Sequence, residues 1–140
     1  MKLIEVTNAL KAIALAQPAI RSVIPNDVYR LNSVPNVSYG VFSFVQGTHR
    51  GDDADLIRYA FTLFYIDRLT EAKDNEIEVQ STGIEVLKNI IKGFENTYCG
   101  GEHQMVRFVT FTERFSDECA GAFASVEFNV PVDSVCEEIY

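Results

Sequence analysis

The order of the hydrophobic patterns along the 140 residues constrains the fold of this chain more than any other feature. Apolar residues recur at helical spacing near the N-terminus and then alternate in two long segments. Helical spacing returns over residues 74–94, and two further alternating segments follow. A pattern with the period of a helix does not suit a strand, because its side chains would point to both faces of a sheet. The sequence therefore predicts an α+β fold with the element order α-β-β-α-β-β.

Composition favours one folded domain spanning residues 1–140. Hydrophobic residues make up 47% of the chain, which is too many for a disordered segment. A chain of this length buries roughly 68% of the surface that its unfolded form exposes, so a single core can stabilise it. We expect helices packed on a mainly antiparallel, four-stranded sheet.

The element boundaries follow from the same periodicities. The first helix is expected to end or kink at Gln17-Pro18, and residues 19–24 to add one more turn. Val28-Tyr29-Arg30 could form a short edge strand. Turn and glycine signals separate the remaining strands. Strands are predicted over residues 37–46, 56–67, 104–114 and 122–130, with a polar loop over residues 47–55.

The second helix has the clearest amphipathic pattern. Asp74 is its expected N-cap, and Gly93 followed by Gly100-Gly101 marks its end. Because Gly83 has no side chain, this part of the helix could approach the sheet closely. Its apolar stripe is Ile77, Ile84, Leu87, Ile91 and Phe94. The predicted core combines this helix with the other elements: Leu10, Ile13, Phe61, Leu63, Ile84, Leu87, Ile91, Phe108, Val126 and Phe128.

The strand predicted over residues 56–67 is apolar on both faces. Phe61 and Leu63 lie on one face, whereas Phe64 and Ile66 lie on the other. Such a strand is covered on both sides within its own chain, or is covered on one side and sealed by a neighbouring subunit.

The net charge of −8 argues against a protein that reads nucleic acid. Neutralising phosphates requires clustered lysine and arginine, and the sequence has no such cluster. An acidic surface along which DNA passes without binding is compatible with this charge. Glu5 and Asn8 interrupt the N-terminal apolar pattern, so we expect no signal peptide and reduced thiols in a cytosol.

Two groups of residues deserve comparison with catalytic or metal sites. Cys99 and His103 flank a pair of glycines and could form a nucleophile and its base, although no third orienting group is evident. Asp52, Asp53 and Asp55 are close in sequence but lack the spacing of a calcium loop. A buried structural thiol and a solvated loop are the simpler interpretations.

The remaining motifs carry less weight. Asp117-Glu118-Cys119 could mark an acidic pair or a metal corner, and a polar hairpin tip is the simpler interpretation. Arg50-Gly51-Asp52 could act as an adhesion motif only if this chain were secreted, and the sequence predicts no secretory signal. We expect no catalytic residue, no cofactor and no metal, so the chain is not predicted to be an enzyme.

Three segments carry a resemblance to a known family. Residues 22–39 read SVIPNDVYRLNSVPNVSY, residues 75–94 read NEIEVQSTGIEVLKNIIKGF, and residues 110–131 read TFTERFSDECAGAFASVEFNVP. In these segments the chain resembles the tail-completion or tail-terminator proteins of tailed bacteriophages. The resemblance covers most of the chain and rests on hydrophobic order with a few anchor residues. It implies a small α+β subunit of a closed ring that caps the tail tube or joins the tail to the head–neck connector.

The resemblance also implies the partners and the location. Copies of the chain would associate as a hexamer or dodecamer in the virion, after assembly in the host cytoplasm. The ring would contact connector, portal-side or tail-tube proteins, with DNA passing through its lumen and no membrane contact. Residues 47–55 are the expected partner-contact loop, because projecting polar loops commonly carry recognition. Its contact residues would be His49, Arg50, Asp52, Asp53 and Asp55.

A different class of function fits the same sequence. A dimeric α+β module that binds a ligand or regulates a partner would share the fold class and the acidic charge. The oligomeric state of the native protein distinguishes the two, because the module predicts a dimer and the ring predicts a closed hexamer or dodecamer.

Overall fold

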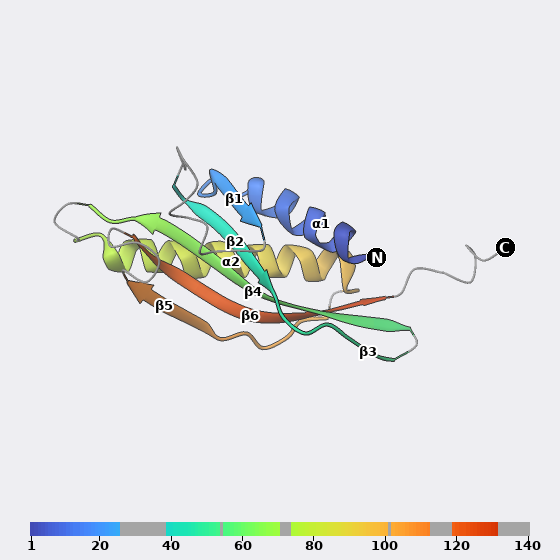
Figure 1. Cartoon of the computed structure of the whole chain (residues 1–140). Coiled ribbons are helices and arrows are strands. Elements are labelled where there is room, and N and C mark those ends of the chain that lie inside the picture. The colour runs from blue at the N-terminus through green and yellow to red at the C-terminus, as the bar shows by residue number, and fades with distance from the viewer. Residues whose placement is uncertain (26–38, 54, 71–73, 101, 113–118, 132–140) are drawn as a thin grey trace.

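The structure is a computed structural model that describes residues 1–25, 39–53, 55–70, 74–100, 102–112 and 119–131. Two helices and six strands make up the described part, which confirms the α+β class (Figure 1). The elements are α1 (Leu3–Leu15), β1 (Ser22–Pro25), β2 (Val41–Gln46), β3 (Arg50–Asp53), β4 (Leu56–Arg68), α2 (Glu76–Tyr98), β5 (Phe108–Thr112) and β6 (Cys119–Pro131).

The strands form one mixed sheet in the order β1-β2-β4-β6-β5, with β3 paired to β4. The expected four-stranded sheet was therefore wrong in detail, because two short strands extend it. β1 replaces the helical turn expected over residues 19–24 and lies parallel to β2, with Val23 opposite Phe42. Val23 and Ile24 are β-branched and suit a strand once β2 offers hydrogen-bonding partners. The other pairings are antiparallel.

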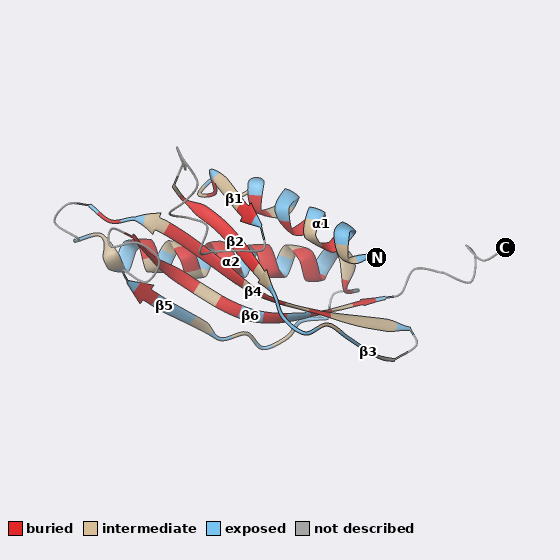
Figure 2. Cartoon of the chain, in the orientation of Figure 1, coloured by how far each residue is buried: buried red, intermediate tan, exposed pale blue. Residues whose placement is uncertain are grey.

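Both helices cover the same face of the sheet and enclose the main core (Figures 1 and 2). Alternate residues of β4 and β6 face α2, and Phe94 packs on Phe128 with ring centroids 4.3 Å apart. Seven predicted core residues are buried: Leu10, Phe61, Leu63, Leu87, Ile91, Val126 and Phe128. The other three are half-buried: Ile13, Ile84 and Phe108.

The apolar stripe of α2 turns away from the sheet towards the start of the helix. Ile91 is 4% exposed, Ile84 is half-buried and Ile77 is 78% exposed, so the prediction for Ile77 was wrong. These three residues repeat every seven positions, and a straight helix rotates such a repeat by about 20° per heptad. Only the part of the stripe near Ile91 therefore faces the core.

The ends of α2 differ slightly from the predicted ones. Asn75 rather than Asp74 is the N-cap, and the hydroxyl of Thr70 donates a 2.6 Å hydrogen bond to the Asp74 carboxylate. Gly93 lies inside the helix, whereas Gly100 follows the C-cap with a φ of 65°, a left-handed conformation that favours glycine.

Gly83 is a position where α2 approaches the sheet closely. A Cβ atom there would lie 3.1 Å from the Tyr65 ring and 3.2 Å from the Cβ of Ala122. The expected close approach is confirmed, and it depends on small residues on both elements.

One end of the sheet is also buried on the face without helices. A second cluster there contains Ile24, Val41, Phe64, Ile66, Phe111 and Cys119. Phe64 is 8% and Ile66 0% exposed in the single chain, so both faces of this half of β4 are covered without a neighbouring subunit.

Three predicted features fall wholly or partly outside the described residues. These are Val28-Tyr29-Arg30, the start of the strand expected over residues 37–46, and most of the connection before β6. Residues 119–121, expected in that connection, belong to β6.

Candidate functional site

The sheet narrows to two strands at Ala60 and Glu127, which lie opposite each other in β4 and β6. On the β4 side, β2 ends at Gln46 and β3 starts at Arg50. On the β6 side, β5 starts only at Phe108, although a strand was predicted from Gln104. Both central strands would leave backbone groups unpaired at this point unless other groups bonded them.

Two side chains and one backbone amide bond these groups. The Ala60 N–H donates to Nδ1 of His49 at 3.0 Å, and the Ala60 carbonyl accepts from Gly47 N at 2.8 Å. The Glu127 N–H donates to Oε1 of Gln104 at 2.8 Å, and Nε2 of Gln104 donates to the Glu127 carbonyl at 2.7 Å. The Gln104 amide thus replaces a strand residue, which explains why β5 begins later than predicted.

His49 is held on the sheet by its ring as well as by this bond. Its ring lies 5.4 Å from the Tyr59 ring and 5.6 Å from the Phe61 ring, measured between centroids. Because Nδ1 accepts a hydrogen bond, Nε2 carries the proton of the neutral ring and donates to Gln46 Oε1 at 3.0 Å. His49 therefore fixes the chain where it passes from β2 to β3.

Residues 50–53 of the predicted loop form the strand β3, so the expectation of a loop was wrong there, whereas residues 47–49 and 55 lie outside the strands. β3 pairs with the start of β4, with Arg50 opposite Arg58. Its sequence, RGDD, has no β-branched or aromatic residue, so the strand depends on the neighbouring β4. β3, the start of β4 and the end of β6 lie beyond the end of α2 (Figure 1). We call these three segments the arm.

The expected contact residues are distributed along the arm. Arg50 Nη2 lies 3.5 Å from Glu127 Oε2 in an exposed ion pair, a type that contributes about 0–1 kcal/mol. Asp52 and Asp53 belong to β3, but their side chains fall outside the described part; Asp55 is exposed in the turn before β4. The arm therefore carries a negative charge at its free end, at Asp55, and an exposed positive charge nearer its base, at Arg50.

Cys99 and His103 line one small cavity of about 60 Å³, together with Glu95 and Glu102. Burial, and then the charges of Glu95 and Glu102, raise the pKa of Cys99 to about 11. The thiol is protonated at neutral pH and is a poor nucleophile. Nδ1 of His103 lies 3.4 Å from a Glu95 carboxylate oxygen. These contacts favour a structural role for Cys99.

No group of three or more His, Cys, Asp or Glu side chains within the described ranges could hold a metal ion. Asp117 and Glu118 lie outside these ranges, whereas Cys119 is buried.

The side chain of Cys119 also contacts Tyr39. Burial is the largest cause that raises the pKa of Tyr39, and its hydrogen bond with Cys119 is the next.

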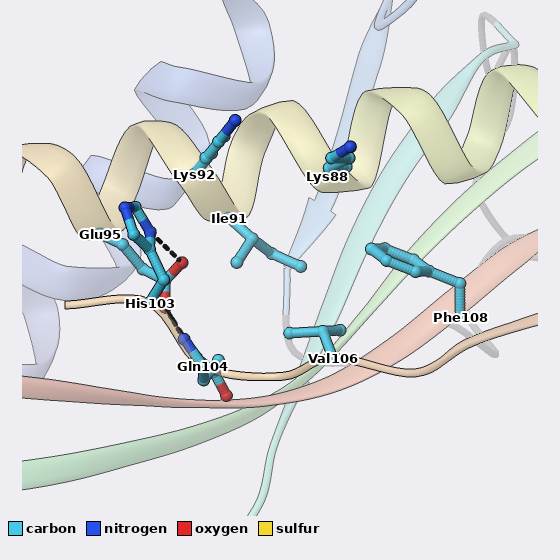
Figure 3. Close-up of a pocket in the computed structure, with 8 residues that line it drawn as sticks. All are labelled: Lys88, Ile91, Lys92, Glu95, His103, Gln104, Val106 and Phe108. Atoms are coloured by element: carbon cyan, nitrogen blue, oxygen red, sulfur yellow. Dashed lines mark hydrogen bonds and ion pairs between the residues drawn. The ribbon is translucent and has the colours of Figure 1, made fainter. Parts of the chain in front are cut away.

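A cleft that the sequence did not predict lies between α2 and residues 103–108 (Figure 3). Its volume is about 190 Å³. Ile91, Val106 and Phe108 point into it, and Glu95, His103 and Gln104 lie at one end (Figure 3). Half-buried Gln104, Val106 and Phe108 alternate with exposed neighbours along this wall.

Buried Glu95 joins the two walls of this cleft. Its carboxylate accepts hydrogen bonds from the Gln104 backbone N–H at 3.0 Å and from the Gln104 side chain at 3.4 Å. Gln104 therefore links α2 to β6 and fixes the distance between residues 103–108 and the helix.

In a scan of family models none matches the chain, and no curated protein matches it either. Over the described ranges, neither helix has the length and apolar character needed to cross a membrane.

Proposed function

We propose that this chain is a structural virion protein, a subunit of a closed ring at the tail or head–tail neck of a bacteriophage. In this role it acts as a tail terminator, tail-completion or connector protein. The observation that carries the proposal is the arm, which extends the sheet beyond its helices and is fixed at its base by His49 and Gln104. A subunit that repeats around an axis needs such a defined element to reach its neighbour.

The charges of the arm suit recognition of adjacent proteins. Asp52, Asp53 and Asp55 give its free end negative charge, and Arg50 adds an exposed positive charge nearby. In this proposal these four residues contact a neighbouring connector, portal-side or tail-tube protein. His49 contributes by holding β3 in place, since its ring nitrogens bond within the chain.

The net charge of −8 suits a subunit that lines a DNA passage. Ser125 and Glu127 are exposed on the helix-free face of β6, where they present small polar and acidic side chains. An acidic wall repels the phosphate backbone and lets DNA pass as cargo. The burial of Phe64 and Ile66 within one chain removes them as a reason for subunit contact, so the proposal rests on the arm and the charge.

The alternative of a dimeric ligand-binding or regulatory module receives less support from the cavities. The cleft beside α2 has about 190 Å³, which is below the roughly 300–1,000 Å³ of typical small-molecule sites. It suits one or two side chains of a protein partner better than a separate ligand.

The mass of the assembled protein tests the proposal. Native mass spectrometry of the chain, alone and mixed with tail-tube or connector proteins encoded beside it, should show six or twelve copies in a closed complex. A stable dimer that does not bind these proteins would favour the dimeric ligand-binding or regulatory module instead.

A further inference from the structure

We propose that the cleft between α2 and residues 103–108 binds the segment 136–140 of a second copy of this chain. The cleft has an apolar floor and a basic rim. Ile91 is 4% exposed, and Val106 and Phe108 leave part of their side chains open to the cleft. Lys88 and Lys92 lie one turn apart on α2 along the rim (Figure 3).

The two lysines are available for a partner. Both are exposed, and neither forms an ion pair with a residue in the described part of the chain. In a chain of net charge −8, two adjacent unpaired lysines beside an apolar surface form a local basic site. An occupant of matching chemistry has carboxylates next to one or two large apolar side chains.

Residues 136–140 have this chemistry. They read CEEIY, with Glu137 and Glu138 directly before Ile139 and Tyr140. The carboxylates would meet Lys88 and Lys92, while Ile139 or Tyr140 fills the apolar floor. The cleft volume of about 190 Å³ matches one large side chain with part of a second.

The course of β6 favours a second copy over the same chain. Glu127 lies beside Gln104 at the end of the cleft, and β6 then continues to Pro131. Those four residues carry the chain roughly 13 Å further along the strand direction. Figure 1 shows β6 passing the end of α2, away from residues 103–108. The described end of β6 therefore points away from the cleft of its own chain, which favours an occupant from a second copy. This contact does not depend on the place of the ring in a virion.

A charge-swap experiment on the full chain tests the proposal. One variant carries Lys88→Glu with Lys92→Glu, and the other carries Glu137→Lys with Glu138→Lys. Sedimentation under reducing conditions should show self-association of the wild type and at least about tenfold weaker association of each variant alone. An equal mixture of the two variants should recover association, because each segment then meets a cleft of opposite charge in another molecule. The control is Lys11→Glu with Arg21→Glu, two exposed residues outside both walls of the cleft, with the same change in net charge.

Each other outcome overturns the proposal. Binding within one chain would give two results together. The mixture would stay monomeric, and a single chain carrying all four substitutions would regain protection of residues 88–95 from hydrogen exchange. Wild-type protein that remains monomeric at millimolar concentration, or association unaffected by the cleft charges, would show that the cleft does not join copies.

Discussion

Ala60 and Glu127 lie opposite each other in the β4–β6 ladder, and each donates its backbone N–H to a side chain instead of to another strand. His49 accepts on one side and Gln104 on the other, at 3.0 and 2.8 Å. The sheet can therefore narrow to two strands without leaving these groups unbonded, and the arm begins at this point.

Replacing Gln104 should weaken the fold. Gln104→Ala removes two hydrogen bonds to Glu127 and leaves the Glu95 carboxylate with fewer donors. We expect a loss of about 1–3 kcal/mol in the free energy of unfolding, measured by urea denaturation. Met105→Ala is the matched control, because Met105 is fully exposed and should change stability by less than about 0.5 kcal/mol. Equal effects of the two substitutions would contradict the role of Gln104.

His49 should stabilise the base of the arm through its acceptor nitrogen. His49→Phe keeps a ring against Tyr59 and Phe61 but offers no acceptor to the Ala60 N–H. We expect faster hydrogen exchange at Ala60 and about 1 kcal/mol lower stability. Unchanged exchange at Ala60, measured by NMR, would mean that the ring alone holds the segment.

Leu87 and Ile77 provide a matched test of the α2 packing. Leu87 is fully buried and Ile77 is 78% exposed on the same helix. Leu87→Ala should reduce stability by about 2–5 kcal/mol. Ile77→Ala should change it by less than about 0.5 kcal/mol. A loss below about 0.5 kcal/mol for Leu87→Ala would mean that the buried face of α2 is wrongly assigned.

Cys99 should react slowly with alkylating reagents at neutral pH. Its pKa is raised to about 11 from an ordinary value of 9.0, by burial and then by Glu95 and Glu102. Because the folded-state pKa is the higher one, its contribution to stability is complete below about pH 9 and is lost as the pH rises towards 11. Cys99→Ala should flatten this part of the stability profile. Rapid alkylation of native Cys99 at pH 7.5, located by peptide mapping, would show an activated thiolate instead.

Charge reversal at the arm should block assembly and leave the fold intact. Asp52→Lys with Asp55→Lys changes the free end of the arm, whereas Glu78→Lys with Glu85→Lys makes the same change in net charge on exposed positions of α2. We expect both proteins to unfold at similar denaturant concentrations. Only the arm variant should lose binding to the neighbouring ring, measured by co-sedimentation. Wild-type binding by the arm variant would remove these aspartates from the interface.

The sequence predicted the parts of the fold that follow from local periodicity. β4 and β6 have long alternating patterns, and the heptad residues Leu87 and Phe94 mark the buried side of α2. β1 and β3 could not be predicted, since Ser22–Pro25 and Arg50–Asp53 become strands through pairing with β2 and β4. Such pairing overrides weak local propensity.

The candidate site was predictable only in part. The position of residues 47–55 between two long strands indicated a projecting element, and the arm confirms this projection. The bonding roles of His49 and Gln104 were missed, because they depend on breaks in the neighbouring strands. The cleft was missed for a similar reason, as it needs Ile91 and Val106 on opposite walls, 15 positions apart in the sequence.

The most direct test of the ring proposal is cryo-electron microscopy of tailed phage particles assembled in the presence of this chain. The account predicts a closed ring of six or twelve copies on the channel axis at the tail or neck. Acidic side chains should face the lumen, and the arms should contact adjacent subunits. A chain located away from the axis, or a lumen lined mainly by lysine and arginine, would contradict it.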